Sequence, residues 1–260
     1  MPDRIRLIPV LLIRNNGLVK SIKFKDHKYV GDPINTVKIF NEKEVDEIVI
    51  LDISATENSR PPDIAKIKEI AGEAFMPMAY GGGITTLEQI KAIINCGVEK
   101  VVLNTSAVNN PDLLRSAADW IGSQSLVVSI DVKKNIWGKY KVYGRNGKAS
   151  TGWDPVDFAR ETERLGAGEI ILNSIDRDGT FDGYDLNILK AVSGAVNIPV
   201  VALGGASGME DFVEAIRAGA SAVAAGSFFV FQKPHRAVLI SYPMETELKQ
   251  HLYQKHQISQ

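Results

Sequence analysis

Short apolar segments recur along the chain and are separated by stretches with the spacing of amphipathic helices. Most of these segments are continuously apolar and do not alternate with polar residues, which is typical of parallel strands covered on both faces. They span positions 6–13, 48–53, 76–80, 101–103, 126–132, 170–174, 199–203 and 222–225. We predict one strand at each of the eight.

Helical periodicity fills most of the intervening sequence. The predicted helices span 87–95, 111–121, 156–165, 186–192 and 209–218, with a further helix near 245–255 in the tail. The stretch 133–148 departs from this alternation, because isolated apolar residues stand there among Lys, Asn and Gly. It predicts a hairpin inserted after the fifth strand. The alternation elsewhere favours a parallel α/β fold.

The chain also repeats itself at a spacing of 122 positions. Glu47 begins the segment Glu-Ile-Val-Ile-Leu-Asp-Ile, and Glu169, 122 positions later (169 − 47), begins Glu-Ile-Ile-Leu-Asn-Ser-Ile. The same spacing relates the glycine pair at 82–83 to the pair at 204–205. Two similar α/β halves fit together most simply as a closed (β/α)8 TIM barrel. We therefore expect one domain over 1–260, with half-barrels at about 4–122 and 123–232.

Composition excludes several classes of function. The chain has 30 basic and 31 acidic side chains among 260 residues, so no net charge draws it to nucleic acid or to a membrane surface. Its single cysteine permits no intramolecular disulfide, and no apolar run approaches the ~20 residues that span a bilayer. A cytoplasmic protein that acts on small molecules or protein partners is expected.

Candidate ligand-binding residues follow the predicted strands, where the ligands of such barrels bind. Glycines let the backbone approach an anion, and exposed N–H groups and small hydroxyls donate hydrogen bonds to it. The repeat supplies two matching clusters, Gly83 with Asn104 and Thr105, and Gly205 with Gly226 and Ser227. A glycine pair alone is more often only a tight turn, but two matching clusters predict two phosphate cradles and an elongated ligand with a phosphate at each end.

Carboxylates for acid–base chemistry are expected between these cradles. Asp131 closes the fifth strand and is the leading candidate, whereas Leu12 stands at the corresponding place in the first strand. Asp178 and Asp52 also follow strands, although an Asp beside a Gly, as in the loop of Asp178, is as often a plain turn. No histidine closes a strand, so neither a metal site nor a cofactor is expected.

Charged residues begin four predicted strands at the opposite end of the barrel. These are Arg6, Glu47, Lys100 and Glu169. Residues there are usually solvated or structural. Their alternating signs could instead close a salt-bridged ring across the barrel floor.

Taken together, these motifs resemble the cyclase subunit of imidazole-glycerol-phosphate synthase, the HisF family, over residues of about 4 to 232. The most specific are Ser174-Ile175-Asp176-Arg177-Asp178-Gly179-Thr180 followed by Gly183-Tyr184-Asp185, then Gly81-Gly82-Gly83-Ile84, Leu103-Asn104-Thr105-Ser106-Ala107-Val108 and Gly204-Gly205-Ala206. The resemblance implies a glutaminase subunit at the N-terminal face of the barrel and ammonia passing through it.

The resemblance also implies roles for individual residues. A bisphosphate ligand would lie across the two cradles, and Lys20 and Asp52 match further functional positions. The four charged residues of the floor match the entrance gate for ammonia. Glu99 matches an acidic position that contacts the glutaminase. The stable unit would then be a heterodimer or a larger assembly.

The chain departs from the family pattern at the mouth of the barrel. Family catalysis needs two aspartates, and Leu12 replaces one of them, a loss that commonly removes a factor of about 10² to 10⁴ in rate. Family hydroxyls correspond to Ala79, Asn173 and Leu203. The floor is retained although the mouth has changed, so cyclase activity should be weak or absent.

Three functions fit these observations. The first is an adaptor that passes ammonia from a glutaminase to an ATP-dependent amidotransferase, as in related proteins that serve acetamidino-sugar synthesis for surface polysaccharides such as lipopolysaccharide. The second is a working cyclase of histidine biosynthesis in which Asp178 or Asp52 replaces the missing group. The third, a phosphosugar isomerase, ranks last because it also normally needs an aspartate on the first strand.

Overall fold

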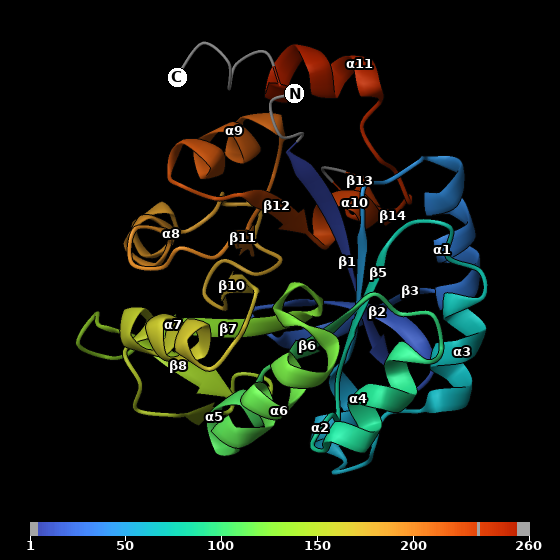
Figure 1. Cartoon of the computed structure of the whole chain (residues 1–260). Helices are drawn as coiled ribbons and strands as arrows, with labels where there is room; N and C mark the ends of the chain where they lie inside the picture. Colours follow the sequence, from blue (N-terminus) through green and yellow to red (C-terminus); the bar gives the residue numbers. More distant parts are fainter. Residues whose placement is uncertain (1–4, 233–234, 254–260) are drawn as a thin grey trace.

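Eight parallel strands close into a barrel in the computed structural model, which describes residues 5–232 and 235–253 (Figure 1). The strands pair in the order β10-β11-β12-β1-β4-β5-β6-β7, and a β10–β7 pairing closes the ring. They are β1 (Arg6–Arg14), β4 (Ile48–Asp52), β5 (Met78–Gly81), β6 (Lys100–Leu103), β7 (Leu126–Lys134), β10 (Glu169–Ser174), β11 (Val200–Leu203) and β12 (Ala222–Ala225). All eight predicted strands are confirmed, with shifts of one or two residues at their ends.

Helices surround the barrel and connect its strands (Figure 1). The longer ones are α1 (Pro33–Glu42), α3 (Ile64–Ala71), α4 (Leu87–Ile94), α6 (Pro111–Ile121), α7 (Pro155–Arg164), α8 (Leu186–Ser193) and α9 (Met209–Arg217). The five helices predicted between strands are confirmed, and α1 and α3 were missed. Aspartate caps begin both missed helices: Asp32 accepts a hydrogen bond from Asn35 N, and Asp63 accepts one from Lys66 N.

Three short helices begin at the carboxyl ends of strands. They are α2 (Ile53–Glu57) after β4, α5 (Thr105–Asn109) after β6 and α10 (Ser227–Val230) after β12. A 3-10 turn, η1 (Ser123–Ser125), precedes β7. Helices α5 and α10 begin at residues predicted to form the phosphate cradles, and α2 begins directly after Asp52, so the three helices fix the backbone of the barrel mouth.

The barrel wall separates two apolar cores. Along β1, Leu7 and Leu11 point outward to the helices, whereas Ile8, Val10 and Leu12 point into the barrel. The inner cluster is small and wholly aliphatic; its buried members are Ile8, Val10, Val49, Ala79, Val102, Val127, Ile171, Val201, Leu203, Ala222 and Ala224. Both faces of each strand are therefore covered by apolar side chains, which explains the continuous apolar runs of the sequence.

Two antiparallel extensions rise from the strand ends. The predicted hairpin is confirmed: β7 continues beyond the barrel and pairs with β8 (Tyr140–Gly144), which pairs in turn with β9 (Ala149–Ser150). The second extension, a hairpin of β2 (Gly17–Ile22) and β3 (Lys25–Gly31), was missed. Only one residue of β3, Val30, is buried, so its sequence carries little strand signal.

The tail runs along the outside of the barrel. A short pairing of β13 (Phe231–Gln232) with β14 (Ala237–Val238) precedes α11 (Glu245–Leu248) and the π-helical turn η2 (Lys249–Tyr253). These last two elements confirm the predicted tail helix, except that positions 254 and 255 lie outside the described residues. Tyr242 donates a hydrogen bond to Leu7 O at 2.9 Å and stacks on Phe229. The tail is thus attached near the start of β1.

Replacing Phe229 by Ala should lower the free energy of unfolding by about 3–5 kcal/mol, because the fully buried ring packs on Phe40, Phe228 and Tyr242. Urea denaturation at unchanged m value measures this loss. Phe75, whose side chain is 86% exposed, provides the control of equal size. Its replacement by Ala should change stability by no more than about 0.5 kcal/mol, and equal losses in the two variants would contradict the packing described here.

Candidate functional site

A cavity of about 960 Å³ opens at the carboxyl ends of the strands. It brings together nearly all of the predicted mouth residues: Leu12, Lys20, Asp52, Gly83, Asn104, Thr105, Asp131, Asp178, Gly226 and Ser227. Gly205 is not among the residues that line it. The carbonyl of Gly205 accepts a hydrogen bond from Gly183 N at 2.9 Å, so this glycine joins two loops beside the cavity.

The first-half cradle is built on a constrained backbone. Gly83 has a φ of +70°, and a Cβ there would lie 2.6 Å from Arg60 O, so only glycine fits. Asn104 donates to Ser129 O at 2.9 Å, which fixes its amide across the mouth. The Thr105 hydroxyl donates to Asn104 Oδ1 at 3.2 Å and accepts from Arg145 N at 3.0 Å. The turn after β8 therefore lies directly over this cradle.

The second-half cradle contains a buried ammonium group. A Cβ at Gly226 would lie 2.6 Å from Lys20 Nζ, so the glycine leaves room for this side chain. Lys20 is 4% exposed and donates a hydrogen bond to Val10 O. Burial lowers the pKa of Lys20 to about 8, and the nearby charge of Asp178 opposes that shift. Ser227 is buried at the first position of α10.

Asp178 belongs to a packed loop and not to a solvated turn. Its carboxylate accepts a hydrogen bond from Ser21 Oγ at 3.2 Å, and its carbonyl accepts one from Lys23 N at 2.9 Å. Gly179 is equally constrained, since a Cβ there would come within 2.1 Å of Ser21 O. Burial raises the pKa of Asp178 to about 6, against the opposing charge of Lys20.

Asp131 is a buried carboxylate held by two amide groups. Asn104 Nδ2 donates to one carboxylate oxygen at 3.1 Å, and Asn173 Nδ2 donates to the other at 3.3 Å. Burial raises the pKa of Asp131 to about 7, although both hydrogen bonds lower it. The group can therefore gain or release a proton near neutral pH, as a general acid or base requires.

Asn173 makes this contact while the oxygen of its own amide has no partner among the described residues. Within the described part of the chain, its Oδ1 is the one buried side-chain oxygen without a hydrogen-bond partner. A Cβ at Gly204 would lie 2.8 Å from that oxygen. Leaving a buried acceptor unpaired costs about 1–3 kcal/mol. The Asn173 amide is thus oriented so that its nitrogen donates to Asp131, and in this orientation its oxygen has no hydrogen-bond donor in the part of the chain that the structure describes.

The position opposite Asp131 is apolar. Leu12 packs on the inner barrel cluster, pairs in register with Leu51 of β4 and lies in the cavity wall together with Leu203. None of these three side chains can exchange a proton. The mouth therefore has an acid–base group on one side and an aliphatic surface on the other.

Asp52 serves as the cap of α2. Its Oδ1 accepts hydrogen bonds from Ser54 N, Ala55 N and the Ser54 hydroxyl at 2.8–3.0 Å. Its Oδ2 pairs with Arg60 at 2.6 Å. Four contacts to local groups leave this carboxylate committed to structure, so it is poorly suited to replace a missing catalytic aspartate.

At the other end of the barrel, four charges form the closed ring that their alternating signs suggested. Arg6 contacts both Glu47 and Glu169, and Lys100 contacts the same two carboxylates at 2.9 Å. The two glutamate side chains are only 5% and 8% exposed. Although burial opposes it, hydrogen bonding to Arg6 lowers the pKa of Glu169. Each carboxylate of the ring is thus compensated by two cations.

Glu99 lies next to this ring on the outside. It is exposed, and its carboxylate accepts a hydrogen bond from Met78 N at 2.6 Å. Phe75 is exposed in the preceding loop between α3 and β5. The base of the barrel therefore presents a carboxylate and a large apolar side chain to solvent.

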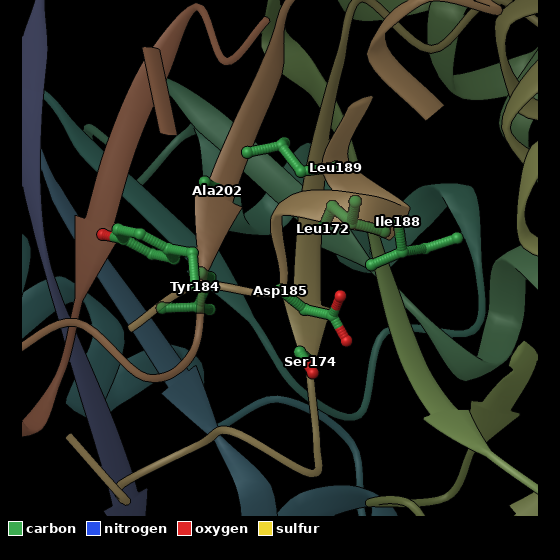
Figure 2. A pocket seen from close by; sticks show the side chains of 8 residues that line it. Leu172, Ser174, Tyr184, Asp185, Ile188, Leu189 and Ala202 are labelled. Atoms are coloured by element: carbon green, nitrogen blue, oxygen red, sulfur yellow. The ribbon is translucent and has the colours of Figure 1, made fainter. Parts of the chain in front are cut away.

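A second, much smaller pocket lies under α8 (Figure 2). Its volume is about 10 Å³, room for a single water molecule. Tyr184 extends past it and donates a hydrogen bond to Ala224 O at 2.8 Å. This pocket is part of the packing between barrel and helices and offers no room for a ligand.

The match to known proteins extends over almost the whole barrel. The family model described as histidine biosynthesis protein matches residues 6–235. The chain belongs to this family, and within it to the HisF barrels. A Pseudomonas aeruginosa protein provisionally named imidazole glycerol phosphate synthase subunit hisF2 is 51% identical over 241 residues, 92% of this chain and 96% of that protein.

Two further HisF relatives cover similar lengths. A Vibrio vulnificus protein provisionally named imidazole glycerol phosphate synthase subunit hisF3 is 46% identical over 254 residues, 96% of each chain. The imidazole glycerol phosphate synthase subunit HisF of Alkaliphilus metalliredigens is 45% identical over 229 residues, 88% of this chain and 91% of that one. The two predictions of a HisF family member and of a (β/α)8 barrel are therefore confirmed. Within the described part of the chain, no helix has the length and apolarity needed to cross a bilayer.

The sequence did not indicate several residues that lie at the mouth of this HisF barrel. Ser21, which contacts Asp178, lies on the missed β2–β3 hairpin. Arg60 follows α2 and neutralises Asp52, and Arg145 belongs to the turn that covers Thr105. The charge of the two arginines was visible in the sequence. Their position was not, because each lies in a loop that tertiary contacts direct back to the mouth.

An Asp131→Asn variant should be more stable than the wild type at pH 8 but not at pH 4. Because the folded pKa is raised from 3.8 to about 7, folding binds a proton between these values, so the wild type loses stability as pH rises through this window. The full effect is at most about 4 kcal/mol. Denaturant unfolding of both proteins across this range measures the difference, and a difference independent of pH would contradict the raised pKa.

Proposed function

We propose that this HisF barrel passes ammonia from a glutaminase subunit to an ATP-dependent amidotransferase that makes an acetamidino sugar for surface polysaccharide. Cyclisation by the barrel itself is weak or absent. The observation that carries the proposal is Leu12, an aliphatic side chain packed into the inner cluster where acid–base chemistry needs a second carboxylate. A buried leucine can neither transfer a proton nor stabilise a developing charge.

The barrel interior supports passage of a small neutral molecule. Between the charged ring and the mouth, most inward side chains are aliphatic, from Ile8 and Val49 up to Leu12 and Leu203, and Ser129 of β7 is a polar exception. An ammonium ion would lose its hydration there at high cost, whereas neutral ammonia would not. An aliphatic interior therefore favours ammonia over ammonium and excludes the solutes that would consume it.

The ring supports a gate at the glutaminase end. Each of its two carboxylates contacts both cations. Displacement of either cation therefore leaves two nearly buried carboxylates with a single positive charge between them, which is energetically costly in a low-dielectric environment. The ring is closed when all four charges are paired, and a docked partner can shift the equilibrium between this closed state and an open one. Glu99 and Phe75 at the same face would contact the glutaminase.

The second candidate function is cyclisation in histidine biosynthesis, favoured by Asp131 and by the retained cradle residues. Phosphate binding at Gly83, Asn104, Thr105, Gly226 and Ser227 is part of either proposal, and Lys20 would supply the cation of the second cradle. Gly205 lies off the cavity wall and would contribute only indirectly, by joining two loops through the carbonyl that accepts from Gly183 N. Asp178 could titrate, but Asp52 is committed to capping α2.

The relatives bear on this choice. Four relatives at 46–51% identity carry provisional names, and two of them are numbered hisF2 and hisF3, as for additional copies beside a first one. Relatives with the plain name HisF are 43–46% identical, so the identities of the two groups meet at 46%. A numbered extra copy is free to lose cyclisation and to supply ammonia to another enzyme. The stable unit would be a heterodimer with the glutaminase or a larger assembly.

Cyclisation of the ribulosyl bisphosphate substrate with added ammonium tests the proposal. The wild type should be at least about 100-fold slower than the Alkaliphilus HisF, because one acid–base group is missing. Leu12→Asp should recover part of the rate, whereas Leu12→Asn, of similar size but without charge, should not. Wild-type turnover at the rate of the relative would overturn the proposal.

A second test follows nitrogen from glutamine. With glutaminase and amidotransferase present, ¹⁵N-amide glutamine in unlabelled ammonium should label the acetamidino product preferentially. Lys100→Met leaves Glu47 and Glu169 with one cation and hydrates the ring, so the labelled fraction should fall while the rate with ammonium alone is kept. Lys100→Arg retains the charge and serves as control. Equal labelling in all three proteins would exclude the ring as a gate.

A further inference from the structure

The hairpin of β7 and β8 presents an apolar pair at its tip. Ile136 is 92% exposed and Trp137 is 80% exposed, and they stand side by side in the turn between the two strands. Exposed aromatic and aliphatic side chains of this size cost solubility unless a partner covers them. Tryptophan is also the residue type most enriched at the energetic centres of protein interfaces.

Hydrogen bonds fix the backbone of the tip, although the side chains of Ile136 and Trp137 are exposed. Asn135 N donates to Lys139 O at 2.9 Å, and Gly138 N donates to Asn135 O at 2.9 Å. The side-chain oxygen of Asn135 accepts from Trp137 N and from Lys139 N, both at 3.0 Å. Four hydrogen bonds within five residues fix the turn. A pre-organised anchor of this kind loses little conformational entropy on binding.

The base of the hairpin is fastened to the barrel as well. Tyr140 donates its hydroxyl hydrogen to Asp185 at 2.8 Å, and Lys134 N donates to Asp176 at 3.0 Å. Figure 1 shows the two strands projecting sideways from the barrel, away from the end at which β1 begins. The tip thus stands beside the mouth and opposite the charged ring.

The hairpin is strongly basic in a chain whose net charge is −1. Positions 132–148 contain no Asp or Glu, and their cations are Lys133, Lys134, Lys139, Lys141, Arg145 and Lys148. Lys148 is paired with Glu57, whereas Lys133 and Lys134 lie over the rings of Tyr143 and Tyr140. The charge is therefore concentrated on one projecting element, and its complement is an acidic surface.

We infer that this hairpin is the docking surface for the ammonia-consuming amidotransferase, with Ile136 and Trp137 seated in an apolar groove whose rim is acidic. The inference rests on the proposed function, because ammonia leaving the mouth is lost to solvent unless the acceptor is held there. An apolar groove fits the Ile–Trp pair better than a nucleic acid does, since isoleucine has neither charge nor a stacking face. The lysines around the tip would steer the acidic rim into register.

Binding between the purified barrel and the amidotransferase, measured at low and high salt, tests the inference. Ile136→Ser combined with Trp137→Ser should raise Kd by at least about 30-fold, the effect of losing an interface hot spot. Lys133→Glu combined with Lys139→Glu should slow association and reduce its salt dependence, because steering is lost. Both pairs of changes lie on an exposed hairpin, and circular dichroism should confirm that the fold is kept.

Met244→Ser is the control, since it removes an exposed apolar side chain (67% exposed) from the tail, away from the hairpin. It should leave the Kd for the amidotransferase unchanged. Wild-type affinity in the Ile136→Ser/Trp137→Ser variant would overturn the docking surface. A second outcome would also overturn it. In that outcome the protein binds a DNA duplex through the hairpin, whereas its binding to the amidotransferase does not depend on the hairpin.

The labelling experiment separates failure of the docking surface from failure of the proposed function. If the wild type carries glutamine nitrogen to the sugar and the tip variant does so equally well, only the docking surface is wrong. If the wild type carries none, the ammonia-transfer function itself fails. If the docking surface is correct, the tip variant loses labelling from glutamine but keeps the product formed from added ammonium.

Discussion

Closure of the barrel by the pairing of β10 with β7 is the constraint on which both ends of the molecule depend. This register sets Asn173 opposite Asp131 at the mouth and Glu169 opposite Val127 at the floor. One run of six paired residues therefore places an amide on the buried carboxylate and a glutamate in the charged ring. A slip of one residue would turn every side chain of β10 to the other face of the wall.

The two ends of the barrel treat buried carboxylates in opposite ways. Glu169 has two cationic partners, which lower its pKa although burial opposes them. Asp131 is as deeply buried but has only neutral amide donors, so burial raises its pKa to about 7. The charge of the neighbouring groups, more than the depth of burial, therefore decides the direction in which the pKa of each buried carboxylate shifts. The floor is thus a fixed set of charges, whereas the mouth keeps a group that can exchange a proton.

Much of this arrangement could be predicted from the sequence. Continuous apolar runs marked all eight barrel strands, because residues covered on both faces leave no polar alternation. The spacing of 122 related the two cradles, and Asp131 was located as the residue that closes its strand. The β2–β3 hairpin was missed because Val30 is the only buried residue of β3. The capping role of Asp52 was also missed, since a strand-end aspartate can face either the cavity or the next helix.

Leu12 affects how the mouth of the barrel handles ammonia, in addition to removing a catalytic carboxylate. A second carboxylate there would hold water and stabilise ammonium, and ammonium is not nucleophilic. Leu12, Leu51 and Leu203 instead continue the aliphatic lining to the rim. Across the mouth from this surface stands Asp131, whose pKa of about 7 leaves it partly protonated at neutral pH. On the proposed role, losing one carboxylate therefore disfavours ring closure and favours release of neutral ammonia to an acceptor held at the mouth.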